Sequence, residues 1–139
     1  MILTLAPDAA YLMGATTTGT VTIDNATAPT VWLTLHDSSA SEAPGNGGLF
    51  SIRRTGSRVA PLTVYFTVGG SATPGLDYHD LGRQLEIAAG SGSATLPVTT
   101  LTDALLEDTE TVLITLAADS SYALGSRFSG TVNILDVPL

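Results

Sequence analysis

Acidic side chains are the strongest candidates for chemistry in this sequence, because they outnumber the basic ones and fall in a few separate segments. The chain has 13 Asp and Glu against 5 Arg, with neither Lys nor Cys, and a formal net charge of −8. The candidate metal ligands are Glu42, Asp77, Asp103, Glu107, Glu110 and Asp136. Clustered carboxylates repel one another unless a cation joins them. Oxygen ligands without His or Cys suit a hard cation, and calcium accepts roughly six to eight oxygens in a flexible geometry. Magnesium would need a tighter octahedron.

The segments between these acids have the alternation of apolar and polar residues that is typical of strands. Strands are predicted at 30–36, 48–54, 62–68, 84–88, 93–100, 110–117 and 130–135, with Gly, Pro, Asn or Ser between them. Seven such strands predict two antiparallel sheets packed face to face. Pro97 falls within one strand, which should therefore lie at an edge or be bulged. No helical period is sustained, and 104–106 is expected to form one helical turn at most. The predicted inward side chains are Val31, Leu33, Leu35, Phe50, Ile52, Leu62, Val64, Phe66, Leu85, Ile87, Leu96, Val98, Val112, Ile114, Leu116, Val132 and Ile134.

The strand order decides whether the acids can meet. In an up-and-down arrangement, the first, third and fifth loops share one end of the sandwich with the exit of the last strand. That end would receive all the candidate ligands, while Arg58 and Arg127 fall at the opposite end. In TDALLEDTE the three acids are four and then three residues apart, so a single turn could aim all of them inward. The alternative is that acids occupy loops because loops are solvated, and topology alone does not decide between the two.

The first 23 residues recur near the end of the chain. MILTLAPDAAYLMGATTTGTVTI matches VLITLAADSSYALGSRFSGTVNI at a constant offset of 111. A chain that ends as it begins is most simply a slice of a tandem array of domains of roughly 110 residues. The sequence therefore predicts a C-terminal hairpin of a preceding repeat at 1–24, a linker at 25–29 and a sandwich domain at 30–137. A lone hairpin is marginally stable in water, so we expect it to dock on its own domain or on another chain. Its similarity to 112–134 also permits strand exchange between copies.

Several stretches together resemble a known family. FSIRRTGS, PLTVYFTVGGSATPGLDYHDLG, LEIAAGSGSATLPVTTLTDALLEDTETVLITL and GTVNILD are similar to the Calx-beta motif over about 40–136. That domain occurs in the cytosolic loop of sodium–calcium exchangers, in an integrin subunit and in tandem in bacterial surface proteins. The resemblance implies a seven-strand immunoglobulin-like sandwich that binds calcium at one end. It assigns the ligand role to Glu42, Asp77, Asp103, Glu107, Glu110 and Asp136.

The sequence departs from the family motif at two places. Thr102 stands where the first acid of an Asp-Asp pair is expected, and the closing acidic run is reduced to Asp136. The expectation is therefore one or two calcium ions, bound weakly or not at all.

Other functions are disfavoured by composition. A chain this acidic could not neutralise a run of phosphates, which argues against nucleic-acid binding. No apolar run approaches the roughly 18 residues of a membrane span, so membrane insertion is not expected. His36 and His79 are the only histidines, and no nucleophile motif accompanies them, so the chain is not expected to be an enzyme. Trp32 and Tyr65 could form a sugar-stacking platform, but aromatic residues of this kind are more often covered by a neighbouring domain.

Two classes of function remain. In the first, the chain is a calcium-binding repeat of an extracellular or cell-surface adhesin-like protein, of bacterial origin by composition, and the ion stiffens the joint between adjacent repeats. In the second, it is a metal-free spacer that self-associates through residues 1–24. Melting with calcium and with a chelator would separate the two.

Overall fold

The computed structural model describes residues 1–21 and 27–137, and within them every regular element is a β-strand. The strands are β1 (Ile2–Thr4), β2 (Thr18–Thr20), β3 (Thr30–Asp37), β4 (Ser39–Ser41), β5 (Gly48–Arg54), β6 (Leu62–Gly69), β7 (Gln84–Ile87), β8 (Ser93–Val98), β9 (Glu110–Leu116), β10 (Ala123–Leu124) and β11 (Ser129–Leu135). All seven strands predicted for the sandwich are present, with ends that shift by up to two residues. The described residues contain no helix with the length and hydrophobicity to span a membrane.

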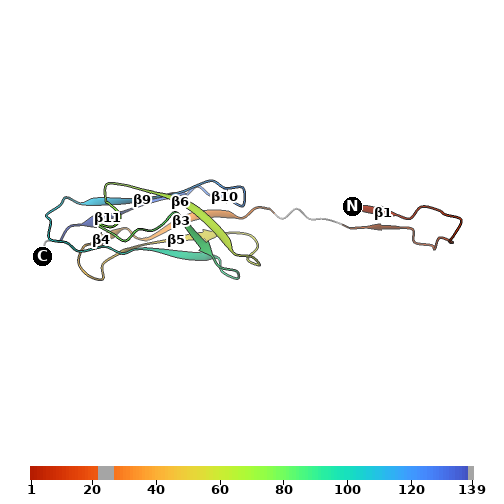
Figure 1. Cartoon of the computed structure of the whole chain (residues 1–139), viewed down its shortest axis with the longest axis horizontal. Coiled ribbons are helices and arrows are strands. Elements are labelled where there is room, and N and C mark those ends of the chain that lie inside the picture. The colour runs from red at the N-terminus through yellow and green to blue at the C-terminus, as the bar shows by residue number, and fades with distance from the viewer. Residues whose placement is uncertain (22–26, 138–139) are drawn as a thin grey trace.

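Two sheets form the sandwich, in the orders β10-β3-β5-β8 and β4-β11-β9-β6-β7 (Figure 1). This confirms the predicted all-β, immunoglobulin-like sandwich. Among the seven long strands, the chain crosses between sheets after β5, after β7 and after β8. Consecutive long strands still run antiparallel, so alternate loops still share one end. Pro97 lies in β8 at the edge of its sheet, as predicted.

Two short strands were not predicted, and both pair in parallel. β10 pairs with β3, and β4 pairs with the last strand, β11. With two and three residues, they are too short to show alternation in the sequence. Residues 104–106, where one helical turn at most was expected, belong to an irregular loop.

The core lies between the sheets and closely follows the predicted inward faces. Phe50, Ile52 and Val64 are fully buried, and Ala40, Ala72, Tyr78 and Tyr122 join them from loops and short strands. Leu35 is the clear exception: it pairs with the fully buried Phe50 and directly precedes a register shift, but it is itself 39% exposed. Leu85 is only partly buried at the edge of the core. Together the core residues fix both sheets, and the loops at each end are anchored to them.

The N-terminal segment forms a separate hairpin of β1 and β2, shown at the N-terminal end in Figure 1. Its register repeats that of β9 and β11: Leu3 faces Gly19 as Ile114 faces Gly130. Its apolar side chains are exposed, so the sandwich of the same chain does not cover them. Docking on the chain's own domain was therefore wrong, and docking on another chain stays a prediction. Residues 22–26 lie outside the described residues, so the boundaries at 24 and 25–29 stay predictions as well.

Candidate metal centre

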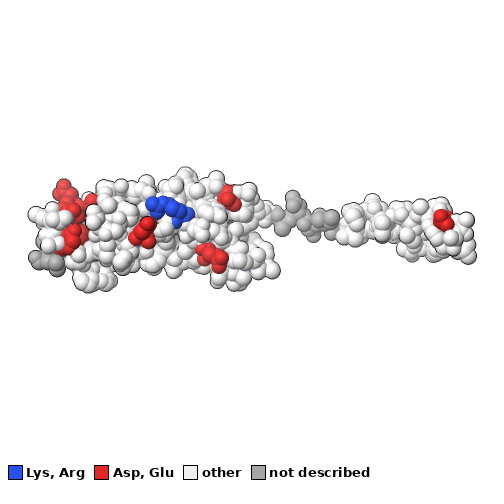
Figure 2. Space-filling model, viewed as in Figure 1, with Lys and Arg blue, Asp and Glu red and all other residues white. Residues whose placement is uncertain are grey.

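The predicted ligands all come from loops or strand ends at one end of the sandwich. Glu42 directly follows β4, Asp77 lies in the β6–β7 loop, Asp103 and Glu107 lie in the β8–β9 loop, Glu110 begins β9, and Asp136 directly follows β11. Figure 2 shows acidic side chains gathered at this end, near the C-terminus. Segments up to 94 residues apart in the chain therefore meet, as the alternation of loops predicted.

Glu42 is held in place by its backbone. Its N–H donates to the carbonyl of Leu135 at 3.1 Å, which extends the parallel pairing of β4 with β11. Its carbonyl accepts a hydrogen bond from the Thr102 hydroxyl. The Glu42 side chain is only 3% exposed, which is rare for a carboxylate without a partner.

Asp77 is fixed by a tight turn in the β6–β7 loop. Gly75 has φ of 87°, a conformation that favours glycine, and its N–H donates to the carbonyl of Tyr78 at 2.8 Å. The Asp77 carboxylate accepts the N–H of Thr73 at 2.5 Å, and Leu101 donates to the Asp77 carbonyl at 2.8 Å. The neighbouring Tyr78 is buried in the core, so the turn cannot drift away from the sandwich.

Hydrogen bonds from backbone N–H groups position Asp136 and Asp103. One oxygen of Asp136 accepts the N–H of Glu107 at 2.9 Å, which joins the exit of β11 to the β8–β9 loop. Asp103 accepts the N–H of Leu105 at 2.7 Å, so this carboxylate is positioned by its own loop.

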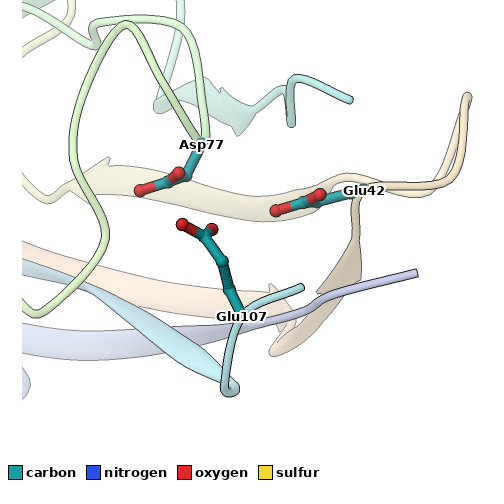
Figure 3. Close-up of side chains that lie close together, drawn as sticks. All are labelled: Glu42, Asp77 and Glu107. Carbon is teal, nitrogen blue, oxygen red and sulfur yellow. The ribbon is translucent and has the colours of Figure 1, made fainter. Parts of the chain in front are cut away.

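Glu42, Asp77 and Glu107 form the closest group (Figure 3). Each offers a carboxylate oxygen, and these oxygens all lie within 4.8 Å of one another. Figure 3 shows the three side chains pointing toward a common space from three separate segments. The charges of Asp103 and Asp136 act on Glu42 and Glu107, and those of Asp77, Glu107 and Glu42 act on Glu110. The structure thus brings all the candidate ligands into one cluster and places three of them at its centre.

The electrostatics of the cluster is that of crowded anions. Burial, followed by the negative charges of Asp136 and Asp103, raises the pKa of Glu42. Burial and the charge of Asp77 raise the pKa of Glu107. Burial, a hydrogen bond with Asp77 and nearby charges raise the pKa of Glu110 to about 7. No Arg contributes to these shifts, so nothing in the described part of the chain neutralises the cluster.

Several carboxylate oxygens here are buried without a hydrogen-bond partner. They are one oxygen each of Glu42, Glu107, Glu110 and Asp136. A buried charge without a partner is costly, and sets of such oxygens in native proteins indicate a ligand. The oxygen-only donor set, drawn from loops, fits a hard divalent cation such as calcium.

Two threonines support the site in a way that sequence reasoning missed. The hydroxyl of Thr100 donates to the carbonyl of Ser41 at 2.7 Å, and that of Thr102 donates to the carbonyl of Glu42. Both join the β8–β9 loop to the segment that carries Glu42. Thr102, which replaces an acid of the family motif, therefore has a positioning role. Alternation of hydrophobicity carries no signal for hydroxyl-to-backbone contacts across 59 or 60 residues.

The histidines do not form a catalytic centre in the described residues. His36 Nε2 lies 2.8 Å from Ser51 Oγ, the nearest approach to a nucleophile and base pair. Ser51 is buried, however, and a serine nucleophile needs access to substrate and an acid to orient its histidine. His79 is exposed and hydrogen bonded only through its backbone to Thr99.

Comparisons with known proteins agree with this architecture. The crystal structure of the apo form of the Calx CBD1 domain is similar with a TM-score of 0.62 and 20% identity, over 80% of this chain and 99% of that one. CBD12 from CALX1.2 is similar with a TM-score of 0.62 and 19% identity, over 77% of this chain. The calcium binding domain CBD12 of CALX1.1 is similar with a TM-score of 0.59 and 22% identity, over 75% of this chain. This chain spans 45% and 44% of those two longer chains. At these identities the likeness establishes the fold.

Family membership comes from the sequence match. The model of the Calx-beta domain family matches residues 24–137, which is most of the chain and contains every candidate ligand. The resemblance noted in the GSATPGLDY and TDALLEDTE stretches is confirmed, and the chain belongs to the Calx-beta domain family.

Proposed function

We propose that this chain is a calcium-binding Calx-beta repeat, a binding module rather than a catalyst. The observation that carries the proposal is the convergence of buried, unpartnered carboxylate oxygens from Glu42, Glu107, Glu110 and Asp136. Bringing these anions together destabilises the folded state, and a divalent cation would offset that cost by accepting their lone pairs. Glu42, Asp77 and Glu107 would hold the first ion, and Asp103, Glu110 and Asp136 would complete its surroundings or hold a second.

The donor atoms favour calcium over other biological metals. Zinc sites are usually built from Cys and His, and neither contributes here. Magnesium demands a near-ideal octahedron and keeps several waters, whereas calcium accepts irregular sets of carboxylates and carbonyls. The ligands come from several loops and strand ends, an arrangement that supplies many oxygens without strict geometry.

The ion would stiffen the joint to a following repeat. Asp136 directly follows β11, and its carboxylate already binds the backbone of Glu107. An ion shared by Asp136 and Glu42 would tie the exit of the domain to the β4 segment, which pairs with β11. We place the module in a tandem-repeat, adhesin-like protein at the bacterial surface, on the basis of the repeated hairpin, the absence of Cys and Lys, and the net charge of −8.

Thermal melting with calcium and with chelator tests the proposal. A ligand that binds only the folded state stabilises it by about 2.7 kcal/mol at a concentration 100-fold above its Kd. We expect calcium to raise the melting temperature and Asp103→Ala to abolish the increase. Glu86→Gln is the matched control, because Glu86 is an exposed acid on β7 outside the cluster, and it should keep the full increase. An increase that persists unchanged in Asp103→Ala would show that calcium acts elsewhere.

A second function, self-association, is favoured by the N-terminal hairpin. Leu3, Leu5 and Val21 are 66%, 52% and 60% exposed. Their equivalents Ile114, Leu116 and Val132 are at most 2% exposed. The hairpin therefore presents the face that, in the sandwich, packs into a core. The strand complement of a preceding repeat, or of another copy, would cover it, and sedimentation measures that association.

A further inference from the structure

The outer face of the β10-β3-β5-β8 sheet has hollows on both sides of Trp32. One of about 310 Å³ is lined by Trp32, Gly125, Ser126 and Arg127. The other, of about 300 Å³, is lined by Trp32, Arg53, Arg54, Arg58, Gly92 and Ser93. Trp32 lies near the start of β3 and Glu42 beyond its end, so these hollows are at the opposite end of the sandwich from the acidic cluster. The volumes are at the small end of the range for ligand sites, which is roughly 300–1,000 Å³.

The indole of Trp32 has open space beside it for a structural reason. Its neighbours Val31 and Leu33 point into the core, so Trp32 points outward. A Cβ on Gly125 would lie 3.3 Å from the Trp32 Cβ, so the bare glycine leaves room on this side. Tyr65 is on β6 in the other sheet, so Trp32 and Tyr65 do not form the sugar-stacking platform that the sequence left open.

The second hollow gathers most of the positive charge of the chain. Arg53 pairs directly across from Trp32 on β5, with its side chain exposed. The Arg58 guanidinium lies against Gly92, where an added Cβ would be 2.7 Å from Nη2. The lining includes no acid, and the one ion pair among the described residues, Arg83 with Asp80, lies elsewhere. These guanidinium groups therefore lack a counter-ion within the described part of the chain.

Arg54 also lines the second hollow, but its side chain lies on the core-facing side of β5, because Arg54 pairs with the buried Val31. Arg54 is only 4% exposed, and Nε and Nη1 donate to the carbonyls of Ser91 at 3.1 Å and Ala60 at 3.0 Å. Nη2 is buried and has no hydrogen-bond partner. Arg54 therefore holds the loops that carry Ser91 and Ala60, and the exposed arginines of the second hollow are Arg53 and Arg58.

We propose that these hollows form a binding site for an acidic sugar. Arg53 and Arg58 would bind its carboxylate, since guanidinium groups recognise carboxylates through paired, charge-assisted hydrogen bonds. The face of Trp32 would pack against the sugar ring, because an aromatic face offers a large apolar surface next to polar edges. Ser93 and Ser126 would meet ring hydroxyls on either side. This inference does not rest on calcium binding, which belongs to the other end of the domain.

The lining favours a sugar over an acidic peptide. Both hollows are lined by small polar residues and arginine around a single aromatic residue, and they contain no aliphatic pocket for a peptide side chain. A hexuronic acid combines one carboxylate with hydroxyls and an apolar ring face, which matches that lining group by group.

Intrinsic fluorescence of the full chain tests the site directly, because Trp32 is the only tryptophan. Glucuronate should change the Trp32 emission in a saturable way, with glucose and inorganic sulfate at equal concentration as separate arms. Glucose should have no effect, since it lacks the charge, and sulfate should bind at least about tenfold more weakly, since it lacks the ring. Oligoglutamate tests the peptide alternative. No saturable change with glucuronate, or equal affinity for sulfate or oligoglutamate, would overturn the proposal.

Arginine substitutions test whether glucuronate binds at these hollows. Arg53→Gln and Arg58→Gln should each weaken glucuronate binding by about tenfold, the loss of one charge-assisted contact. Both side chains are exposed, so the fold should survive. Arg83→Gln is the matched control, because Arg83 pairs with Asp80 outside the hollows, and it should bind as the native chain does. Unchanged binding in both Arg53→Gln and Arg58→Gln would contradict the site.

Discussion

At the scale of single residues, the buried charge of Glu42 should destabilise the metal-free protein. The same carboxylate should be needed for calcium to stabilise the fold. The Glu42 side chain is 3% exposed, and one of its oxygens lacks a partner. In chelator, Glu42→Gln should raise the free energy of unfolding by about 1 kcal/mol, since it removes one buried charge from a group of anions. In calcium, the same change should remove most of the stabilisation. Glu86→Gln, on an exposed strand position, should change neither.

Melting curves of the native chain and both variants, in chelator and in calcium, measure these opposite changes in stability. Equal destabilisation of Glu42→Gln in chelator and in calcium would mean that Glu42 acts only through packing, and the metal role would be lost.

The raised pKa of Glu110 predicts an unusual pH dependence of the metal-free protein. Burial, the hydrogen bond with Asp77 and nearby charges raise this pKa from 4.5 to about 7. Between these values the folded state binds more protons than the unfolded state, so the free energy of unfolding falls as pH rises through this window. Glu110 alone would contribute up to about 3 kcal/mol. Calcium should reverse the trend, because protons compete with the ion for the same oxygens.

Chemical denaturation in chelator at about pH 5 and about pH 8 measures this difference. Glu110→Gln should flatten the dependence. A metal-free protein that gains stability between those pH values would contradict the proposed crowding of anions.

At the scale of elements, the Tyr122 hydroxyl links the end of β9 to the neighbouring strand β6. Its hydroxyl donates to the carbonyl of Ala117 at 2.7 Å and accepts the N–H of Tyr65 at 3.1 Å. Tyr122→Phe should lower the free energy of unfolding by about 1–2 kcal/mol, because two buried backbone groups lose their partner. The chain offers a matched control in Tyr11, the equivalent residue of the hairpin, which is 49% exposed. Tyr11→Phe should leave the stability unchanged, and an equal loss in both variants would contradict this reading of the hairpin as unpacked.

The long strands could be predicted from sequence because each has one buried face. Val31, Ile52 and Val64 alternate with outward residues, and period-two alternation reports that burial directly. β4 and β10 escaped prediction because they are too short to alternate. The burial of Leu35 was overestimated because alternation predicts which face a side chain takes and not how much of the strand end the other sheet covers.

The candidate site was partly predictable for a similar reason. Alternation of loops between the two ends needs only strands that alternate in direction, so the convergence of the acids could be predicted without the order of strands in each sheet. The detailed geometry did not follow. The contacts of Thr102 and Arg54 join residues 60 and 37 positions apart, and their partners are backbone carbonyls that carry no sequence signature.

At the scale of the whole molecule, the exposed hairpin predicts self-association. A Leu3→Ser and Val21→Ser double variant removes two exposed apolar side chains whose equivalents in the sandwich are buried. In sedimentation at increasing concentration, the native chain should form larger species, and the double variant should remain monomeric, because it has lost apolar area to bury. Val59→Ser is the control, since Val59 is 89% exposed in a loop of the sandwich. A native chain that stays monomeric at all concentrations would contradict association through the hairpin.

Calcium binding at the acidic cluster can be measured by calorimetric titration of the full chain. We expect saturable binding of one or two ions, which Asp77→Asn abolishes or weakens at least about tenfold, while Glu86→Gln binds as the native chain does. Absence of binding at millimolar calcium, or binding that survives unchanged in Asp77→Asn, would contradict it.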